Sequence, residues 1–135
     1  MYGALYIVAT PIGNLSDISD RAKQVLSEVD LIAVEDTRVS KKILKKFNID
    51  NKMIVYNNFN ESKQVNKIVN LLKEETNIAL ISDAGTPCIS DPGYLLVNAC
   101  KKNNINVISI PGPSSLISAL STSGLPSDSF YFEGF

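Results

Sequence analysis

Short runs of aliphatic and β-branched residues alternate along this chain with segments of helical periodicity. The runs are Leu5–Ala9, Leu31–Val34, Met53–Tyr56, Ile78–Ser82, Val107–Ile110 and Phe130–Phe132. Apolar residues recur at positions i, i+3, i+4 and i+7 in two of the intervening segments, Ala22–Val29 and Val65–Leu72. This alternation is typical of βαβ units. We therefore predict an α/β fold with a mainly parallel, roughly five-stranded sheet and helices on both faces.

The length of 135 residues, with 44% hydrophobic residues, predicts one domain over residues 1–135. A domain of this size buries enough surface to fold without a metal or a disulfide. Cys88 and Cys100 are not part of a CxxC pair, and the chain contains no histidine. We expect both cysteines to be reduced core residues, and we expect no metal site.

Several sequence features bear on compartment and boundaries. The first basic residue is Arg21, so the apolar opening has no charged n-region and no signal peptide is expected. The stretch from Asn103 to Ser127 is uncharged, but its three prolines argue against a membrane span. We expect a cytoplasmic protein that does not contact a membrane. Because the last predicted strand runs into Phe135, we also expect the chain to be part of a longer protein.

Loops rich in glycine and proline follow three of the predicted strands. They are Thr10–Leu15, Ser82–Pro87 with its extension Ile89–Gly93, and Pro111–Ser115. Turn chemistry explains any one of them, but three such loops at the carboxyl edge of one parallel sheet indicate a ligand cleft. Neither a GxGxxG pattern nor a Walker lysine is present. Asp91-Pro92 and Gly112-Pro113 are predicted to start the next helices.

Carboxylates follow two of the buried strands. Asp83 either caps its own turn or accepts hydrogen bonds from a ligand. Glu35 and Asp36 are adjacent, so burial and mutual repulsion can raise the pKa of one and make it a general base. The alternative is a helix start, with Thr37 as N-cap and the acids favoured by the helix dipole. Without histidine, proton transfer is left to a carboxylate, Lys, Tyr, Cys or the substrate.

A basic run without acidic residues follows these carboxylates. It contains Arg38, Lys41, Lys42, Lys45 and Lys46. Such a run either contacts nucleic-acid phosphates or is a solvated helix face.

Five segments together resemble one known family. They are VATPIGNLSDIS (8–19), EDTR (35–38), SDAGTPCISDPG (82–93), PGPSS (111–115) and FYFEGF (130–135). The chain resembles the amino-terminal half of the bacterial ribosomal RNA small-subunit methyltransferase I family, which belongs to the tetrapyrrole (corrin/porphyrin) methylase superfamily. Cys88 departs from the aliphatic residue expected at its position.

The resemblance implies an S-adenosylmethionine-dependent methyltransferase that methylates the ribose 2′-hydroxyl of a cytidine in 16S ribosomal RNA of the small ribosomal subunit. It also implies a homodimer, and a cofactor cleft whose second wall belongs to a carboxy-terminal domain that is absent from this chain and begins after residue 135. The residues expected at the cofactor are Pro11, Ile12, Asp83, Ala84, Gly85, Thr86, Ser114 and Ser115. Glu35 or Asp36 is the candidate base, and the basic run is the candidate RNA contact.

Two alternatives to this function stay open. One is a methyltransferase of the same superfamily that acts on a corrin or porphyrin, which the basic run disfavours. The other is a ligand-binding module without catalysis. If the cleft needs its second wall, the 135-residue chain alone is expected to fold but not to methylate.

Overall fold

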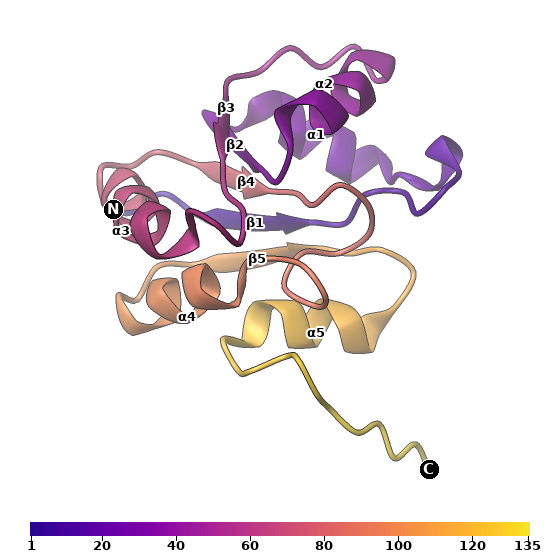
Figure 1. Ribbon diagram of the computed structural model, residues 1–135, viewed down its shortest axis with the longest axis vertical. Helices are drawn as coiled ribbons and strands as arrows, with labels where there is room; N and C mark the ends of the chain where they lie inside the picture. The colour runs from indigo at the N-terminus through magenta and orange to yellow at the C-terminus, as the bar shows by residue number, and fades with distance from the viewer.

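A five-stranded, fully parallel sheet forms the centre of the molecule, and a computed structural model describes all 135 residues of the chain. The strands are β1 (Leu5–Val8), β2 (Leu31–Val34), β3 (Met53–Val55), β4 (Ile78–Leu80) and β5 (Val107–Ile110). Their spatial order is β3-β2-β4-β1-β5, so β4 returns between β2 and β1. The predicted α/β fold and its five-stranded parallel sheet are confirmed (Figure 1).

Helices cover both faces of this sheet. They are α1 (Asp20–Glu28), α2 (Thr37–Lys46), α3 (Glu61–Lys73), α4 (Tyr94–Lys102) and α5 (Ser115–Ser123), with a 3-10 turn η1 (Leu15–Asp17) before α1. In Figure 1, α1 and α2 lie on one side of the sheet, and α3, α4 and α5 lie on the other. This arrangement follows from right-handed βαβ crossovers: those from β1 through β2 to β3 run in one direction across the sheet, and those from β3 through β4 to β5 run in the other.

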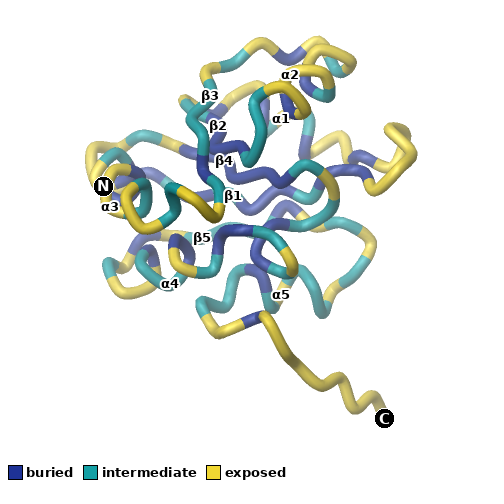
Figure 2. Tube along the Cα trace, viewed as in Figure 1, coloured by how far each residue is buried: buried dark blue, intermediate teal, exposed yellow.

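The strand residues alternate between two hydrophobic clusters, one under each helical layer. Ile78 and Leu80 pack in the cluster with α3 and α4, whereas Ala79 and Ile81 pack in the cluster with α1 and α2. This alternation follows from the two-residue period of a strand, and burial on both faces explains why the strands read as continuous apolar runs. In Figure 2 the central strands β2, β4 and β1 are mostly buried and the edge strands β3 and β5 are mostly intermediate, whereas exposure is concentrated on the outer helices and the tail.

The cysteines are free and lie in the core, as expected. Cys88 and Cys100 are both in the cluster with α3 and α4, where burial raises the pKa of each thiol to about 12. They are therefore protonated, weakly reactive core residues at neutral pH.

The predicted sixth strand, Phe130–Phe132, is wrong. Residues 124–135 contain no helix or strand, and Tyr131 and Phe132 are 85% and 70% exposed. Figure 1 shows this tail leaving the body of the molecule below α5. Aromatic residues favour strands because they pack on a pleated, half-buried surface, and no neighbouring strand offers one here.

The two predicted helix starts lie slightly too early. Helix α4 begins at Tyr94, with Gly93 as N-cap, so Asp91 and Pro92 belong to the preceding turn. Helix α5 begins at Ser115, with Ser114 as N-cap. None of the helices is both long and apolar enough to cross a membrane.

Candidate functional site

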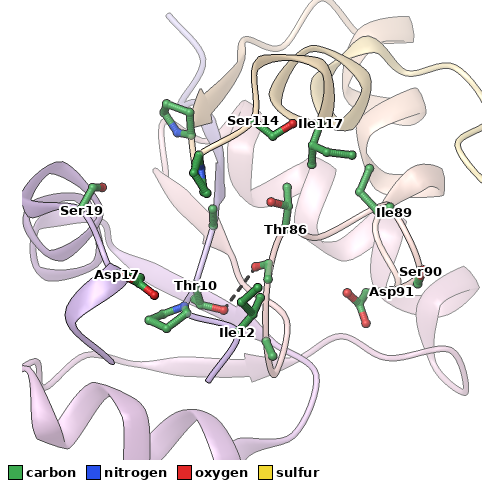
Figure 3. A pocket seen from close by; sticks show the side chains of 17 residues that line it. Thr10, Ile12, Asp17, Ser19, Thr86, Ile89, Ser90, Asp91, Ser114 and Ile117 are labelled. Atoms are coloured by element: carbon green, nitrogen blue, oxygen red, sulfur yellow. Dashed lines mark hydrogen bonds between the residues drawn. The ribbon is translucent and has the colours of Figure 1, made fainter. Parts of the chain in front are cut away.

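A cavity opens at the carboxyl edge of the sheet, where the loops after β1, β4 and β5 meet. Its volume is about 690 Å³. The lining residues come from Ala9–Ile12, Asp17, Ser19, Ala84–Thr86, Ile89–Asp91, Pro111–Ser114 and Ile117. Figure 3 shows Asp17 and Ser19 on one side of this cavity and Ile89, Ser90 and Asp91 on the other. The three loops that the sequence analysis selected therefore form one site.

A short antiparallel bridge fixes two of these loops to each other. The Thr10 N–H donates to the Gly85 carbonyl at 2.9 Å, and the Gly85 N–H donates to the Thr10 carbonyl at 3.0 Å. The Thr10 hydroxyl also donates to the Gly85 carbonyl at 3.3 Å, a contact drawn in Figure 3. Thr10 is buried, so these contacts are shielded from water. The cavity floor is thus preformed.

The wall formed by Ile89, Ser90 and Asp91 is anchored at both ends. At one end, the Ser127 hydroxyl donates to the Cys88 carbonyl. At the other end, the Gly93 N–H donates to Glu61 Oε1 at 3.2 Å, and the same oxygen accepts from the buried Tyr56 hydroxyl at 2.7 Å. Because Glu61 opens α3, this helix holds a loop that is far away in sequence. The wall is therefore fixed by contacts outside the cavity.

The lining carries acidic and neutral polar groups but no lysine or arginine. Asp17 and Asp91 are its charged residues, and hydroxyls come from Thr10, Ser19 and Ser114 among others. Helix α5 starts at this cavity, and no side chain caps its first amide groups. Free N–H groups at a helix start favour an anionic group, whereas the carboxylates favour a cationic one. The cavity can therefore accept a ligand that carries both charges.

Six of the eight predicted cofactor residues line this cavity. They are Pro11, Ile12, Ala84, Gly85, Thr86 and Ser114. Asp83 and Ser115 are not in the lining. Ser115 is exposed in the first turn of α5, and one carboxylate oxygen of Asp83, Oδ1, is buried without a hydrogen-bond partner.

Asp83 belongs instead to a group of carboxylates beside the cavity. Burial raises the pKa of Glu35, and the negative charges of Asp83 and Asp91 raise it further, opposed by the Asp83 N–H. Burial likewise raises the pKa of Asp83, opposed by a hydrogen bond from the Asp36 backbone and assisted to a smaller extent by the negative charge of Asp36. Burial and the charge of Asp83 raise the pKa of Asp91, opposed by the Ser82 hydroxyl. Glu35 has the shifted pKa that suits a general base.

Asp36 has a different environment from Glu35. It is the N-cap of α2, and Oδ1 accepts from the Arg38 N–H at 2.8 Å. The Arg38 guanidinium pairs with Oδ2 at 2.9 Å, and these contacts lower the pKa of Asp36. The sequence analysis considered Thr37 as the N-cap, and this was wrong, because the Asp36 side chain makes the contact. Asp36 caps a helix and holds Arg38.

The basic run lies along α2, as its spacing predicts. Lys41, Lys42, Lys45 and Lys46 are exposed, and none of them forms a salt bridge. Lys42, Lys45 and Lys46 border a groove that also touches Gly13 and Leu15. Since the loop after β1 contributes to both, this basic groove adjoins the cavity.

Sequence reasoning missed part of the site. The residues it did not select as ligand contacts include Thr10, Asp17, Ser19, Ile89, Ser90 and Asp91. The loops that the sequence analysis identified contain four of these residues, Thr10, Ile89, Ser90 and Asp91. Membership of those loops was therefore enough to predict that they line the site. No group of three or more His, Cys, Asp or Glu side chains is placed to hold a metal ion.

Known proteins similar to this chain include methyltransferases of ribosomal RNA. Ribosomal RNA small subunit methyltransferase I from Vibrio cholerae is 56% identical over 97% of this chain and 46% of that protein. The protein of the same name from Escherichia coli is 52% identical over 98% of this chain and 46% of that protein. The chain thus spans about half the length of these curated relatives.

A solved structure and a family model give the same fold. The crystal structure of uroporphyrin-III-C-methyltransferase from Thermus thermophilus superposes with a TM-score of 0.67 at 21% identity, covering 93% of this chain and 55% of that one. The model of the tetrapyrrole (corrin/porphyrin) methylases matches residues 4–133, almost the whole chain. The expected resemblance is confirmed: this chain belongs to the tetrapyrrole (corrin/porphyrin) methylase family.

Proposed function

We propose that this chain is the amino-terminal part of an S-adenosylmethionine-dependent methyltransferase that methylates the ribose 2′-hydroxyl of a cytidine in 16S ribosomal RNA. The observation that carries the proposal is the cavity of about 690 Å³ at the carboxyl edge of the sheet, bordered by an exposed basic helix. The names of the relatives from Vibrio cholerae and Escherichia coli support a ribosomal RNA substrate.

The cavity fits S-adenosylmethionine in size and in charge. Its volume lies within the range of about 300–1,000 Å³ that is usual for small-molecule sites. The uncapped amides at the start of α5 suit the carboxylate of the methionine part, and Asp17 or Asp91 suits its ammonium or sulfonium. When bound, this cofactor supplies an activated methyl group on the sulfonium. The chain's residues then bind and align the cofactor and the ribose, exclude water, and supply a proton acceptor for the hydroxyl.

Glu35 is the better of the two candidate bases. A ribose hydroxyl is a weak nucleophile that benefits from a nearby proton acceptor. The raised pKa of Glu35 makes its carboxylate more basic than an ordinary one, whereas the pKa of Asp36 is lowered by Arg38. In this proposal Glu35 accepts the hydroxyl proton, and Asp36 keeps α2 and Arg38 in place.

The lysines of α2 would bind RNA phosphates beside the cavity. Their ammonium groups have no acidic partner in the chain, so binding a phosphate breaks no existing salt bridge. Asp83 and Ser115 stand outside the lining, and their contact with the cofactor remains a prediction.

The full-length protein would be a cytoplasmic homodimer that acts on the small ribosomal subunit. The cavity is open on one side in this chain, and a second domain would bury the rest of the cofactor, since tight pockets enclose most of their ligand. For that reason we also propose that the 135-residue chain alone does not transfer methyl groups.

The test is methyl transfer by the full-length protein to small ribosomal subunits. Subunits from cells that lack the enzyme are incubated with S-adenosylmethionine tritiated in the methyl group, and the RNA is digested to nucleosides. The expected product is 2′-O-methylcytidine from 16S RNA. Label on a base, or none in RNA, overturns the proposal, and transfer to a porphyrin precursor instead supports the tetrapyrrole alternative.

A further inference from the structure

A second cavity lies behind the wall of the first. Its volume is about 540 Å³, and Ile89, Ser90 and Asp91 line both cavities. Its other lining residues are Asn58, Cys88, Tyr94, Pro126, Ser127 and Asp128. Because a single segment of chain separates the two, ligands bound in them would be neighbours across the rim at Ser90, which is exposed.

The lining of this second cavity selects against phosphate. It contains no lysine or arginine, and Asp91 and Asp128 contribute negative charge. Its other polar groups are the Asn58 amide and the hydroxyls of Ser90, Tyr94 and Ser127. These groups suit a neutral ligand that offers hydrogen-bond donors, because carboxylates only accept and an amide both donates and accepts.

The turn between β3 and α3 carries two side chains without a partner in the chain: Asn58 lines this cavity, and Phe59 follows it in the sequence, outside the lining. Asn57 Oδ1 accepts from the N–H groups of Phe59 and Asn60 at 3.0 and 3.1 Å, and the Asn60 amide donates to the Val55 carbonyl at 3.0 Å. These contacts hold the turn rigidly, yet Asn58 makes no hydrogen bond and Phe59 is 99% exposed.

A free amide in the lining of a cavity, with an uncovered aromatic residue next to it in the chain, is suited to a nucleobase. Single-stranded RNA is recognised by stacking its bases on aromatic rings and by hydrogen bonds to the base edges. Tyr94 adds a second aromatic ring inside the cavity itself. An exposed phenyl ring in a rigid turn gains by stacking, since the base replaces water on its face.

We propose that the second cavity, with Asn58 in its lining and Phe59 next to Asn58 in the chain, binds the base of the ribonucleotide whose ribose is methylated from the first cavity. This inference rests on the proposed function and names the place of its substrate. A base seated behind Ile89–Asp91 brings its ribose to the rim shared with the first cavity, where the methyl donor would lie. Close alignment of the reacting atoms is the main requirement of this chemistry.

The experiment uses the full-length protein with Asn58→Ala and Phe59→Ala, and Asn66→Ala as the matched control. Asn66 is an exposed asparagine on α3 outside both cavities. Saturation-transfer NMR measures binding of free cytidine, and calorimetry measures cofactor affinity. Methyl transfer is assayed with small ribosomal subunits. Phe59→Trp keeps the ring and is expected to retain activity.

We expect Asn58→Ala and Phe59→Ala each to reduce kcat/KM for the subunit on the order of tenfold, and to weaken cytidine binding, with unchanged cofactor affinity. Unchanged cofactor affinity also shows that the variants are folded. If both variants bind cytidine and transfer methyl as Asn66→Ala does, the nucleoside cavity is overturned while the proposed function stands. If the wild-type protein binds cytidine but methylates no RNA, the proposed function fails instead.

Discussion

Replacing Gly93 by alanine tests how tightly the wall between the two cavities is built. A Cβ atom at Gly93 would lie 2.4 Å from Cys88 Sγ and 3.0 Å from Leu80 Cδ2. Cys88 and Leu80 are 3% and 1% exposed, so neither can move aside into solvent. Such overpacking costs about 1–3 kcal/mol. The φ of +144° at Gly93 adds a backbone strain of about 1–3 kcal/mol for alanine. We expect Gly93→Ala to lower the free energy of unfolding by about 2–6 kcal/mol in total.

Gly13→Ala is the matched control for this prediction. Gly13 has nearly the same φ, +147°, but nothing lies within 4 Å of its Cβ position. Only the backbone strain applies there. Urea unfolding should therefore show that Gly13→Ala lowers the free energy of unfolding less than Gly93→Ala does, by about 1–3 kcal/mol. Adding Cys88→Ala to Gly93→Ala should recover part of the difference. Equal losses at Gly93 and Gly13 would refute the packing argument.

Three further predictions concern charge and domain structure. Glu35→Gln should raise the Tm at pH 7, because the raised folded pKa means that ionisation of Glu35 opposes folding as pH rises; thermal scans should show this gain shrinking toward pH 4, and a gain independent of pH contradicts it. Neutralising Lys41, Lys42 and Lys45 in the full-length protein should make the slope of log affinity for the subunit against log salt concentration less steep, by about 0.7–0.9 per lost phosphate contact. An unchanged slope in filter-binding assays would show that these lysines of α2 do not contact RNA. The 135-residue chain should unfold cooperatively but transfer no methyl groups to subunits; measurable transfer with micromolar cofactor binding would disprove the need for a second wall.

The sheet and the main cavity were predictable because their signals are local. A strand buried on both faces is a continuous apolar run, and a loop that must turn sharply at the end of a strand contains glycine and proline. Pro11, Gly85 and Ser114 could therefore be assigned to one sheet edge before their contacts were known. The parallel arrangement then required these three loops to meet.

The errors arose where a distant partner decides the local structure. The start of α4 depends on Glu61, which accepts the Gly93 N–H from a position 32 residues earlier in the chain. The environment of Asp83 depends on Glu35 and Asp36, which follow the neighbouring strand β2. The aromatic residues Phe130–Phe132 have the composition of a strand but no strand to pair with. The residues next to each of these positions in the sequence do not indicate which distant residues they will contact.

In the proposed function, the division of charge over the carboxyl edge separates the RNA backbone from the cofactor. Lysines of α2 border the basic groove, whereas Glu35, Asp83 and Asp91 form a group of carboxylates at the cavities, both of which Asp91 lines. Phosphates would be attracted to the lysines and repelled by the carboxylates, so the RNA backbone would stay on the rim. A base and its ribose are uncharged, so the carboxylates do not repel them. The positively charged sulfonium is attracted to the carboxylates. The same carboxylates would thus admit the reacting groups and keep the phosphates outside.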